Sequence, residues 1–461
     1  MSIEYLGLDS INGPLVVLEG VQDVAFDEIV EFSVQRTKKK LGRVIEVYED
    51  KAIIQVFEST ADMSLENTHT RLTGRPMEIP LSPEILGRTF DGIGRPIDQL
   101  GDVSSVMKRD VNGDPLNPVS REYPRNFIQT GISAIDGLTT LIRGQKLPFF
   151  SGDGLPHNEL AAQIVRQANL GEGSSEKFGV VFAAMGVQHD VADFFRRTFE
   201  ESGVLDRVTM FLNVASDPVI ERIMTPRVAL TAAEYLAYDL GMHILVIMTD
   251  MTAYCEALRE ISASKQEIPS RKGYPGYLYS DLAMLYERAG IVAGKPGSVT
   301  QIPILTMPND DITHPIPDLT GYITEGQVVF DRDLQGKSIY PPIDILPSLS
   351  RLMKGGIGEK YTRGDHQAVA NQLFASYSRV KEARSLASVI GEDELAPTDK
   401  KYLAYGRKFE DQFLGQAKDE NRSIIETLDF AWELLRMLPR EELDRIDTQL
   451  LDQYYGLEKV L

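Results

Sequence analysis

The sequence predicts a multidomain α/β protein in three parts. Apolar and polar residues alternate with period two near the amino terminus, short apolar runs alternate with helical patterns in the middle, and strand signals stop near Lys354. We therefore expect a small antiparallel β-barrel over residues 1–75, a parallel sheet with flanking helices over 76–353, and an α-helical domain over 354–461. A chain of 461 residues is long enough for several such domains.

The composition is that of a globular protein with an acidic surplus, since 43 % of residues are hydrophobic and the formal net charge is −20. Such a charge disfavours a sequence-independent nucleic-acid binder, whose affinity comes from basic side chains on phosphates. Cys255 is the only cysteine, which fits a reducing compartment. No apolar run reaches the roughly 18 residues of a membrane span, and residues 1–10 do not resemble a signal peptide. If the protein takes part in a membrane process, we therefore expect it to act from the aqueous side.

Strand patterns dominate residues 14–57. Val30, Phe32 and Val34 alternate with polar residues, and residues 52–56 alternate less regularly. Glu49 and Asp50 separate two such runs at hairpin distance. About four or five short strands here suggest a small antiparallel barrel or sandwich. Turn signals rich in Gly and Pro follow over residues 60–145, which we interpret as a linker and an approach to the next domain.

Between residues 144 and 353 the alternation of apolar runs and helical patterns indicates a parallel sheet covered on both faces. Asp250 directly follows one of these runs, and ligand groups in such sheets gather at the carboxyl ends of strands. Beyond residue 354 the apolar residues recur at helical spacing only. We expect strands at 179–184, 208–212, 243–249 and 301–307, helices at 189–202, 219–240 and 252–262, and further helical faces formed by Ala370, Leu373 and Tyr377 and by Ile424, Leu428 and Leu435.

Residues 147–159 have the layout of a phosphate-binding loop, in which an apolar strand enters a Gly-rich turn and an amphipathic helix leaves it. The pattern G-x-x-x-x-G-K-[ST] nevertheless fails at each chemical position. Ser151 replaces the first Gly, and Pro156 replaces the second, which removes an N–H. His157 stands where a Lys would supply a fixed positive charge. Asn158 stands where a hydroxyl would ligate Mg²⁺.

Two interpretations of this loop stay open. It is either an ordinary turn with Pro156 at the first helical position, or a phosphate loop that has lost its phosphate but kept the turn at Gly152 and Gly154. His157 as a general base is a weaker hypothesis, because no partner for it is evident nearby in the sequence. Asp250 is either a carboxylate that holds Mg²⁺ through water or the cap of a helix beginning near Thr252, and capping is the simpler interpretation.

The order of barrel, phosphate-loop sheet and helical end resembles the α and β subunits of rotary ATPases, and within that family the B subunit of the V-type (A/V-type) ATPases. The altered loop, residues 184–188 (Ala-Met-Gly-Val-Gln) and residues 274–277 (Tyr-Pro-Gly-Tyr) are characteristic of that subunit. Residues 340–351, which end in Ser348-Leu349-Ser350-Arg351, are similar to the segment that carries the family's trans-acting arginine. Residues 86–98, 130–138 and 143–146 also resemble family segments.

The resemblance implies a RecA-like central domain and a ring in which three catalytic A subunits alternate with three B subunits around a rotating shaft. It implies no cofactor or metal held by this chain alone, with ATP or ADP and Mg²⁺ bound at the A/B interface on the loop of A. Arg351 would act there in trans, and Val187 stands where catalytic relatives carry the glutamate that orients water. The implied protein is a non-catalytic regulatory subunit that helps couple ATP hydrolysis or synthesis to H⁺ or Na⁺ transport. It would be peripheral on the cytoplasmic face of a membrane, with central and peripheral stalk subunits as further partners.

Arginine suits the trans role because it stays charged and presents a rigid fork of donors. A guanidinium on the transferring phosphoryl group is worth about 10³ to 10⁵ in rate. The alternative is an ordinary surface arginine. Two other functions are compatible with the domain order: a self-sufficient NTPase whose altered loop still binds nucleotide, and a ring-shaped nucleic-acid translocase. The second is disfavoured by the missing loop lysine and the charge of −20.

Overall fold

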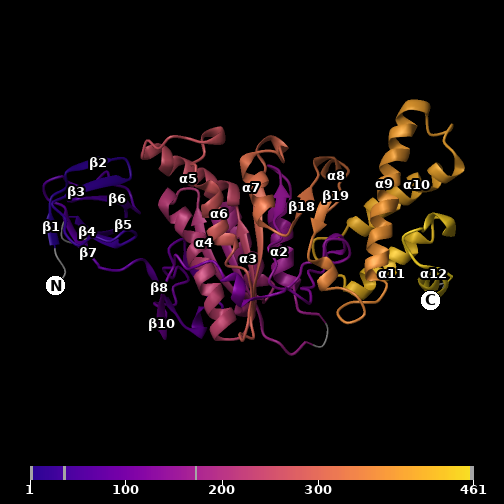
Figure 1. Ribbon diagram of the computed structural model, residues 1–461, viewed down its shortest axis with the longest axis horizontal. Helices are drawn as coiled ribbons and strands as arrows, with labels where there is room; N and C mark the ends of the chain where they lie inside the picture. Colours follow the sequence, from indigo (N-terminus) through magenta and orange to yellow (C-terminus); the bar gives the residue numbers. More distant parts are fainter. Residues whose placement is uncertain (1–3, 35–37, 172–173, 457–461) are drawn as a thin grey trace.

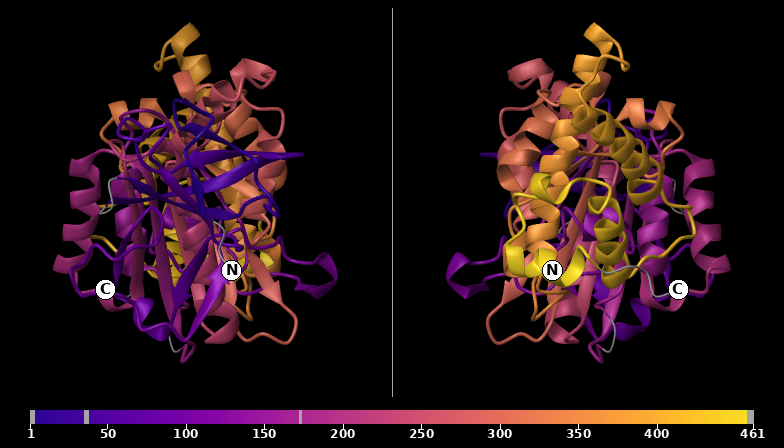
Figure 2. Two further views of the ribbon diagram at one scale, coloured as in Figure 1. Left: turned by 90° about the vertical axis from the view of Figure 1, so that its left-hand side faces the viewer. Right: turned by 90° about the vertical axis from the view of Figure 1, so that its right-hand side faces the viewer.

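The computed structural model describes residues 4–34, 38–171 and 174–456, and these form an elongated molecule in three parts (Figure 1). A small β-barrel lies at one end, an α/β sheet in the middle and a group of helices at the other end. Seen along the long axis, the barrel covers one end of the central sheet and the carboxyl-terminal helices cover the other (Figure 2). The predicted order of barrel, central α/β domain and helical domain is confirmed.

Antiparallel strands form the barrel as one seven-stranded sheet in the order β1-β7-β4-β5-β6-β3-β2. The alternation in the sequence produces its inner face, because Val30, Phe32 and Val34 are buried while the residues between them are half-exposed. Residues 49–50 form the expected hairpin turn. The strands are β1 (Glu4–Leu6), β2 (Ser10–Asn12), β3 (Leu15–Glu19), β4 (Ile29–Val34), β5 (Lys38–Tyr48), β6 (Lys51–Val56) and β7 (His69–Leu72).

Residues 60–145 are more than the linker that their turn signals suggested. Strand β7 belongs to the barrel, and β8 (Glu78–Leu81) pairs with β10 (Met107–Asp110). Strand β9 (Thr89–Asp91) joins the edge of the central sheet beside β14 (Val208–Val214), and β11 (Arg121–Glu122) pairs with β16 (Gly290–Val292). These strands have two to four residues, too few to show periodicity, and their partners lie far away in sequence.

The central sheet runs in the order β19-β18-β12-β17-β15-β13-β14-β9. Neighbouring strands along this path are parallel, except that β19 is antiparallel to β18. The four expected strands are present: β15 has the predicted bounds, and β13, β14 and β17 differ from theirs by one to three residues at an end. The strands are β12 (Phe149–Ser151), β13 (Phe178–Val187), β14 (Val208–Val214), β15 (His243–Thr249), β16 (Gly290–Val292), β17 (Ser298–Thr306), β18 (Gly326–Phe330) and β19 (Ile343–Ser350).

Helices cover both faces of this sheet, so its strands are apolar throughout. Alternate residues of β13 enter two different cores. Phe182 packs with α2 (His157–Gln167) and α3 (His189–Glu201), whereas Ala183 packs with α4 (Val219–Glu234) and α5 (Met251–Ser264). The helices of this domain are α1 (Ser133–Asp136), α2 (His157–Gln167), α3 (His189–Glu201), α4 (Val219–Glu234), α5 (Met251–Ser264), α6 (Leu278–Tyr286), α7 (Pro315–Ile323) and α8 (Arg332–Gly336).

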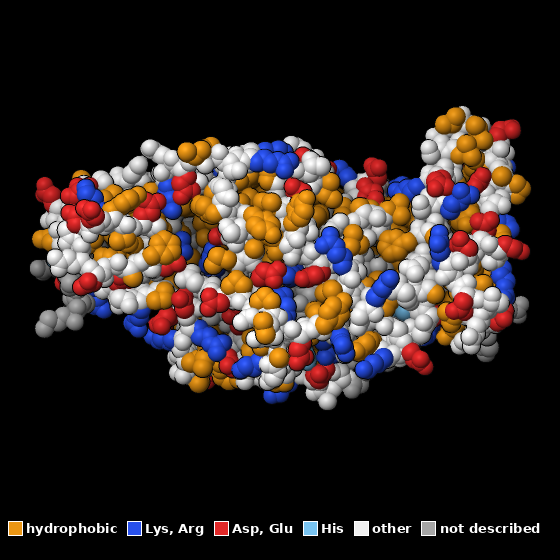
Figure 3. All heavy atoms as spheres, in the orientation of Figure 1, with side chains coloured by type: hydrophobic (Ala, Val, Ile, Leu, Met, Phe, Trp, Pro, Cys, Tyr) orange, Lys and Arg blue, Asp and Glu red, His pale blue; other side chains and the backbone are white. Residues whose placement is uncertain are grey.

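The carboxyl-terminal part is helical: α9 (His366–Ile390), α10 (Pro397–Lys408), α11 (Ile424–Leu435) and α12 (Thr448–Tyr454). Ala370, Leu373 and Tyr377 are buried on one face of α9, as their spacing predicts. The far end of α9 projects with α10 from the body, and apolar side chains show at this projection (Figures 1 and 3), where Val389 is 80 % exposed. None of the helices in the described part of the chain is both long and apolar enough to cross a membrane.

His366 at the start of α9 ties the helical domain to the central domain. Its side chain is completely buried. The ring Nε2–H donates to the carbonyl oxygen of Gly137 at 3.0 Å, and Nδ1 accepts from the Thr362 hydroxyl at 3.0 Å. Burial lowers the pKa of His366 to about 4, so the ring is neutral near pH 7 and satisfies both hydrogen bonds in that form.

This buried histidine makes stability depend on pH. Because the folded-state pKa of His366 is depressed to about 4, against about 6.5 in the unfolded chain, the unfolded state binds more protons between these values. Stability therefore falls as pH falls. We expect the wild type to lose about 2 kcal/mol of unfolding free energy between pH 7 and pH 5 that a His366→Gln variant does not lose. Urea unfolding of both proteins at both pH values measures this difference, and equal losses in the two proteins would contradict it.

Candidate functional site

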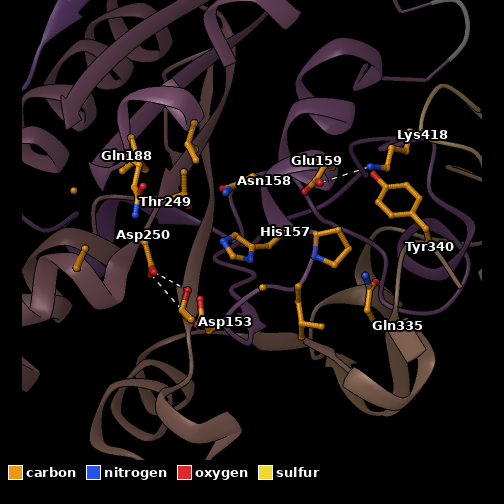
Figure 4. A pocket seen from close by; sticks show the side chains of 18 of the residues that line it. Asp153, His157, Asn158, Glu159, Gln188, Thr249, Asp250, Gln335, Tyr340 and Lys418 are labelled. Carbon is orange, nitrogen blue, oxygen red and sulfur yellow. Dashed lines mark hydrogen bonds and ion pairs between the residues drawn. The ribbon is translucent and has the colours of Figure 1, made fainter. Parts of the chain in front are cut away.

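The altered loop has the predicted layout. Strand β12 ends at Ser151, the Gly-rich turn follows, and α2 begins at His157, with Pro156 as the residue just before the helix rather than its first residue. Loop and helix line a cavity of about 710 Å³ at the carboxyl edge of the sheet. Figure 4 shows His157 in the middle of this cavity, between Asp250 on one side and Tyr340 on the other.

Two backbone N–H groups of the loop donate to carbonyl oxygens within the loop. Leu155 N–H donates to the carbonyl oxygen of Gly152 at 3.2 Å, and His157 N–H donates to that of Leu155 at 2.9 Å. Pro156 between them has no N–H. In a phosphate-binding loop the backbone N–H groups face the phosphates. Here positions 155, 156 and 157 offer a phosphate no N–H donor. The turn itself still requires glycine, because Gly154 has φ +74° and a Cβ on Gly152 would lie 2.2 Å from the Asp310 Oδ1 atom.

His157 does not replace the positive charge of a loop lysine. Its Nδ1 lies 3.0 Å from the hydroxyl oxygen of Ser151. Burial lowers the pKa of His157, which keeps the imidazole neutral at pH 7. The structure thus brings a hydroxyl to the histidine, which the sequence did not suggest. Ser151 is completely buried, however, so this hydroxyl cannot reach a substrate in the cavity.

The charged residues of the cavity oppose a nucleotide. Of the described residues, three carboxylates line it, those of Asp153, Glu159 and Asp250, and one ammonium, that of Lys418. That ammonium lies 3.6 Å from a carboxylate oxygen of Glu159 and 5.6 Å from the centre of the Tyr340 ring, and Figure 4 shows the three side chains together. The lining is therefore net negative, and it repels a triphosphate through Coulomb's law.

Asp250 caps a helix, in agreement with the simpler of its two interpretations. Its Oδ1 accepts from Thr252 N–H at 2.8 Å and from Thr306 N–H at 3.2 Å, and its Oδ2 accepts from the Thr306 hydroxyl at 2.6 Å. Both oxygens are thus committed to α5 and β17. Asn158 Oδ1 is buried and has no hydrogen-bond donor among the described residues. Asn158 offers an amide in place of the hydroxyl ligand, and both carboxylate oxygens of Asp250 are already hydrogen-bonded. These side chains therefore do not fit Mg²⁺.

Val187 ends β13 at a register shift, and its side chain faces the cavity while only 8 % exposed. It offers no group that accepts a hydrogen bond from water. On the far wall, Tyr340 donates its hydroxyl to Gln163 Oε1 at 2.8 Å. Reasoning from the sequence did not find Tyr340 or Lys418 as parts of this site, because 78 positions separate them and only folding brings them together.

Arg351 lies at the opposite edge of the sheet from the loop. Because β19 is antiparallel to β18, its last residue, Ser350, pairs with Gly326 at the start of β18, whereas the loop follows the end of the parallel strand β12. The Arg351 side chain is exposed, and its Nη1 donates to the carbonyl oxygen of Thr324 at 3.1 Å. Among the described residues no carboxylate lies within ion-pair distance of it. The structure therefore does not bring Arg351 to the loop of its own chain.

Comparison with known proteins assigns the fold and site to a class. Three family descriptions match in the order of the structural parts: the beta-barrel domain of the ATP synthase alpha/beta family over residues 9–72, the nucleotide-binding domain of that family over 131–350, and the C-terminal domain of V and A type ATP synthase over 355–455. The chain is thus an ATP synthase alpha/beta-type subunit.

Individual relatives narrow the class. The V-type ATP synthase beta chain 2 of Clostridium tetani is 66 % identical over 100 % of both chains. The V-type ATP synthase beta chain of Halothermothrix orenii is 64 % identical over 98 % of this chain and 97 % of its own. A solved structure, the ATP synthase subunit NeqB of Nanoarcheaum equitans, is 40 % identical, covers 92 % of this chain and 100 % of its own, and superposes with a TM-score of 0.74. The chain therefore belongs to the family of V-type ATP synthase beta chains.

Proposed function

We propose that this protein is the non-catalytic, regulatory B subunit of a V-type ATP synthase head. It alternates with catalytic A subunits in a ring of six and helps couple ATP hydrolysis or synthesis to H⁺ or Na⁺ transport. One observation carries the non-catalytic role: among the described residues, the altered loop has a histidine at the lysine position, no free N–H over residues 155–157 and no Mg²⁺ ligand set, and the cavity lining is net negative. A site for phosphoryl transfer needs the opposite of each property.

In this proposal Arg351 is the contribution of the chain to catalysis. Two observations support this role: the Arg351 guanidinium is exposed and has no carboxylate partner among the described residues, and it lies at the sheet edge opposite the chain's own loop. ATP or ADP with Mg²⁺ is then bound at the A/B interface on the loop of A. The chain sits peripherally on the cytoplasmic face of the membrane and also contacts the central and peripheral stalks.

The proposal predicts that the isolated chain binds ATP or ADP weakly or not at all. The loop lacks an N–H at Pro156, a fixed charge at His157 and a metal ligand at Asn158. Each loss is worth about 1 to 3 kcal/mol for a charge-assisted hydrogen bond, so affinity falls by at least about a hundredfold. Calorimetry of the chain with MgATP checks this result, and the purified A partner is the positive control. Sub-micromolar binding by the isolated chain would instead favour the self-sufficient NTPase.

Assembly is tested separately by the native mass of the chain mixed with its A partner, with and without nucleotide. We expect a ring of three copies of each chain. A chain that stays monomeric under all of these conditions would remove the structural basis of the proposal, whatever its nucleotide affinity.

A further inference from the structure

We propose that a polar cluster beneath Arg351, in which Gln145 and Lys146 are buried and Glu325 and Ser350 are half-buried, positions that arginine for its work in trans. The inference rests on the proposed role of Arg351 and adds the residues that hold it. An exposed arginine on a flexible base would lose rate, because misplacing a catalytic group by about 1 Å costs up to about a hundredfold. The cluster holds in a fixed position the backbone that carries the exposed Arg351 side chain.

The segment that joins α7 to β18 anchors Arg351 at two points. The Arg351 N–H donates to the carbonyl oxygen of Glu325 at 2.9 Å, and its Nη1 donates to that of Thr324 at 3.1 Å. Strands β18 and β19 approach closely here, since a Cβ on Gly326 would lie 2.2 Å from the carbonyl oxygen of Leu349. The position of the guanidinium therefore follows the position of residues 324–325.

Gln145 bridges Ser350, the last residue of β19, and Glu325, the residue before β18. Its side chain is completely buried, and its Nε2 donates both to the carbonyl oxygen of Glu325 at 3.2 Å and to the hydroxyl oxygen of Ser350 at 2.8 Å. Its Oε1 accepts from Ile142 N–H at 2.9 Å. The Ser350 hydroxyl in turn donates to the carbonyl oxygen of Thr140 at 2.9 Å. The side-chain amide of Gln145 thus links two residues to the segment that leads into β12: Ser350, which precedes Arg351, and Glu325, whose carbonyl accepts the Arg351 N–H.

Lys146 holds Glu325 in position through a hydrogen bond and an ion pair. Its backbone N–H donates to Glu325 Oε2 at 2.9 Å, and its Nζ lies 2.9 Å from Glu325 Oε1 and 2.7 Å from Glu287 Oε1. The lysine side chain is only 2 % exposed. Its two carboxylate partners, Glu325 and Glu287, are 26 % and 35 % exposed, and such a partly buried ion pair contributes little net stability. Both carboxylate oxygens of Glu325 are engaged, so the residue that accepts the Arg351 N–H has little freedom to move.

Ser350→Ala in the assembled head tests the inference because it removes one small hydroxyl. We expect the kcat of ATP hydrolysis to fall about tenfold while KM stays within about twofold, since the arginine matters most in the transition state. Ser350→Thr keeps the hydroxyl and should retain most of the rate. Gln145→Glu keeps the acceptor for Ile142 N–H but loses the donors, and it should act like Ser350→Ala. The matched control is Ser348→Ala on the same strand, whose hydroxyl donates to the carbonyl oxygen of Asp344 at 2.5 Å and accepts from Val329 N–H of β18 at 2.8 Å, with no hydrogen bond to the four residues of the cluster.

The deciding measurement repeats Ser350→Ala in an Arg351→Ala background. If the hydroxyl acts through the arginine, its loss changes kcat there by less than about twofold, because coupled residues are not additive. An equal loss in both backgrounds, or a similar loss in Ser348→Ala, would show that the hydroxyl supports only the strand, and the positioning inference would fall alone. Normal turnover of the Arg351→Ala head would overturn the trans role itself and the inference with it.

Discussion

Assembled heads that carry Arg351→Ala are expected to hydrolyse ATP at least about a hundredfold more slowly than wild-type heads. Folding and assembly should be unchanged, because the side chain is exposed and, among the described residues, hydrogen-bonds only to the carbonyl oxygen of Thr324. The loss should fall on kcat rather than on KM, since the guanidinium gains most when charge shifts in the transition state. Steady-state ATPase rates of size-purified heads, beside their melting curves, measure it.

Two further variants sharpen this experiment. Arg351→Lys should also be slow, because an ammonium on a flexible stem does not reproduce the bidentate donor fork. Arg379→Ala removes another half-exposed guanidinium, on α9, and should leave turnover near the wild-type value. A purely structural Arg351 predicts the reverse outcome: Arg351→Ala would lower the melting temperature or the yield of rings, and the rings that formed would work normally.

The second large effect is expected from rebuilding the loop. Pro156→Gly, His157→Lys and Asn158→Thr together restore an N–H, a fixed charge and a hydroxyl, while the turn at Gly152 and Gly154 is already present. Each restored group is worth about 1 to 3 kcal/mol, so we expect the isolated triple variant to bind MgATP at least about a hundredfold more tightly than the wild type. Calorimetry of both proteins measures this gain.

The rebuilt loop should still not turn over ATP. Val187 offers no acceptor for the attacking water, and both Asp250 oxygens remain bonded to Thr252 and Thr306. The His157→Lys single variant serves as a control for charge alone. Rapid hydrolysis by the isolated triple variant would show that the missing loop groups were the only defect. An unchanged affinity would show that the negative lining, which the variant keeps, dominates.

Local patterns in the sequence were sufficient for much of the fold. The alternation at Val30, Phe32 and Val34 predicted barrel strands, and the apolar runs of the middle third predicted β13, β14, β15 and β17 to within a few residues. These elements are long and buried, so their periodicity is plain. The chemistry missing from the loop was also readable in advance, because Pro156, His157 and Asn158 lack the required groups in any conformation.

Other properties depend on contacts between residues far apart in the chain. Local sequence patterns did not predict three features: the edge strand β9, the cavity wall formed by Tyr340 and Lys418, and the hydrogen bond of Asp250 to Thr306. The same holds for Gln145, which reaches Ser350 across 205 positions. Sequence patterns record which groups a residue has and which face of its element it occupies. Strand order and direction decide which of these groups meet, and here they place Arg351 and the altered loop at opposite edges of one sheet.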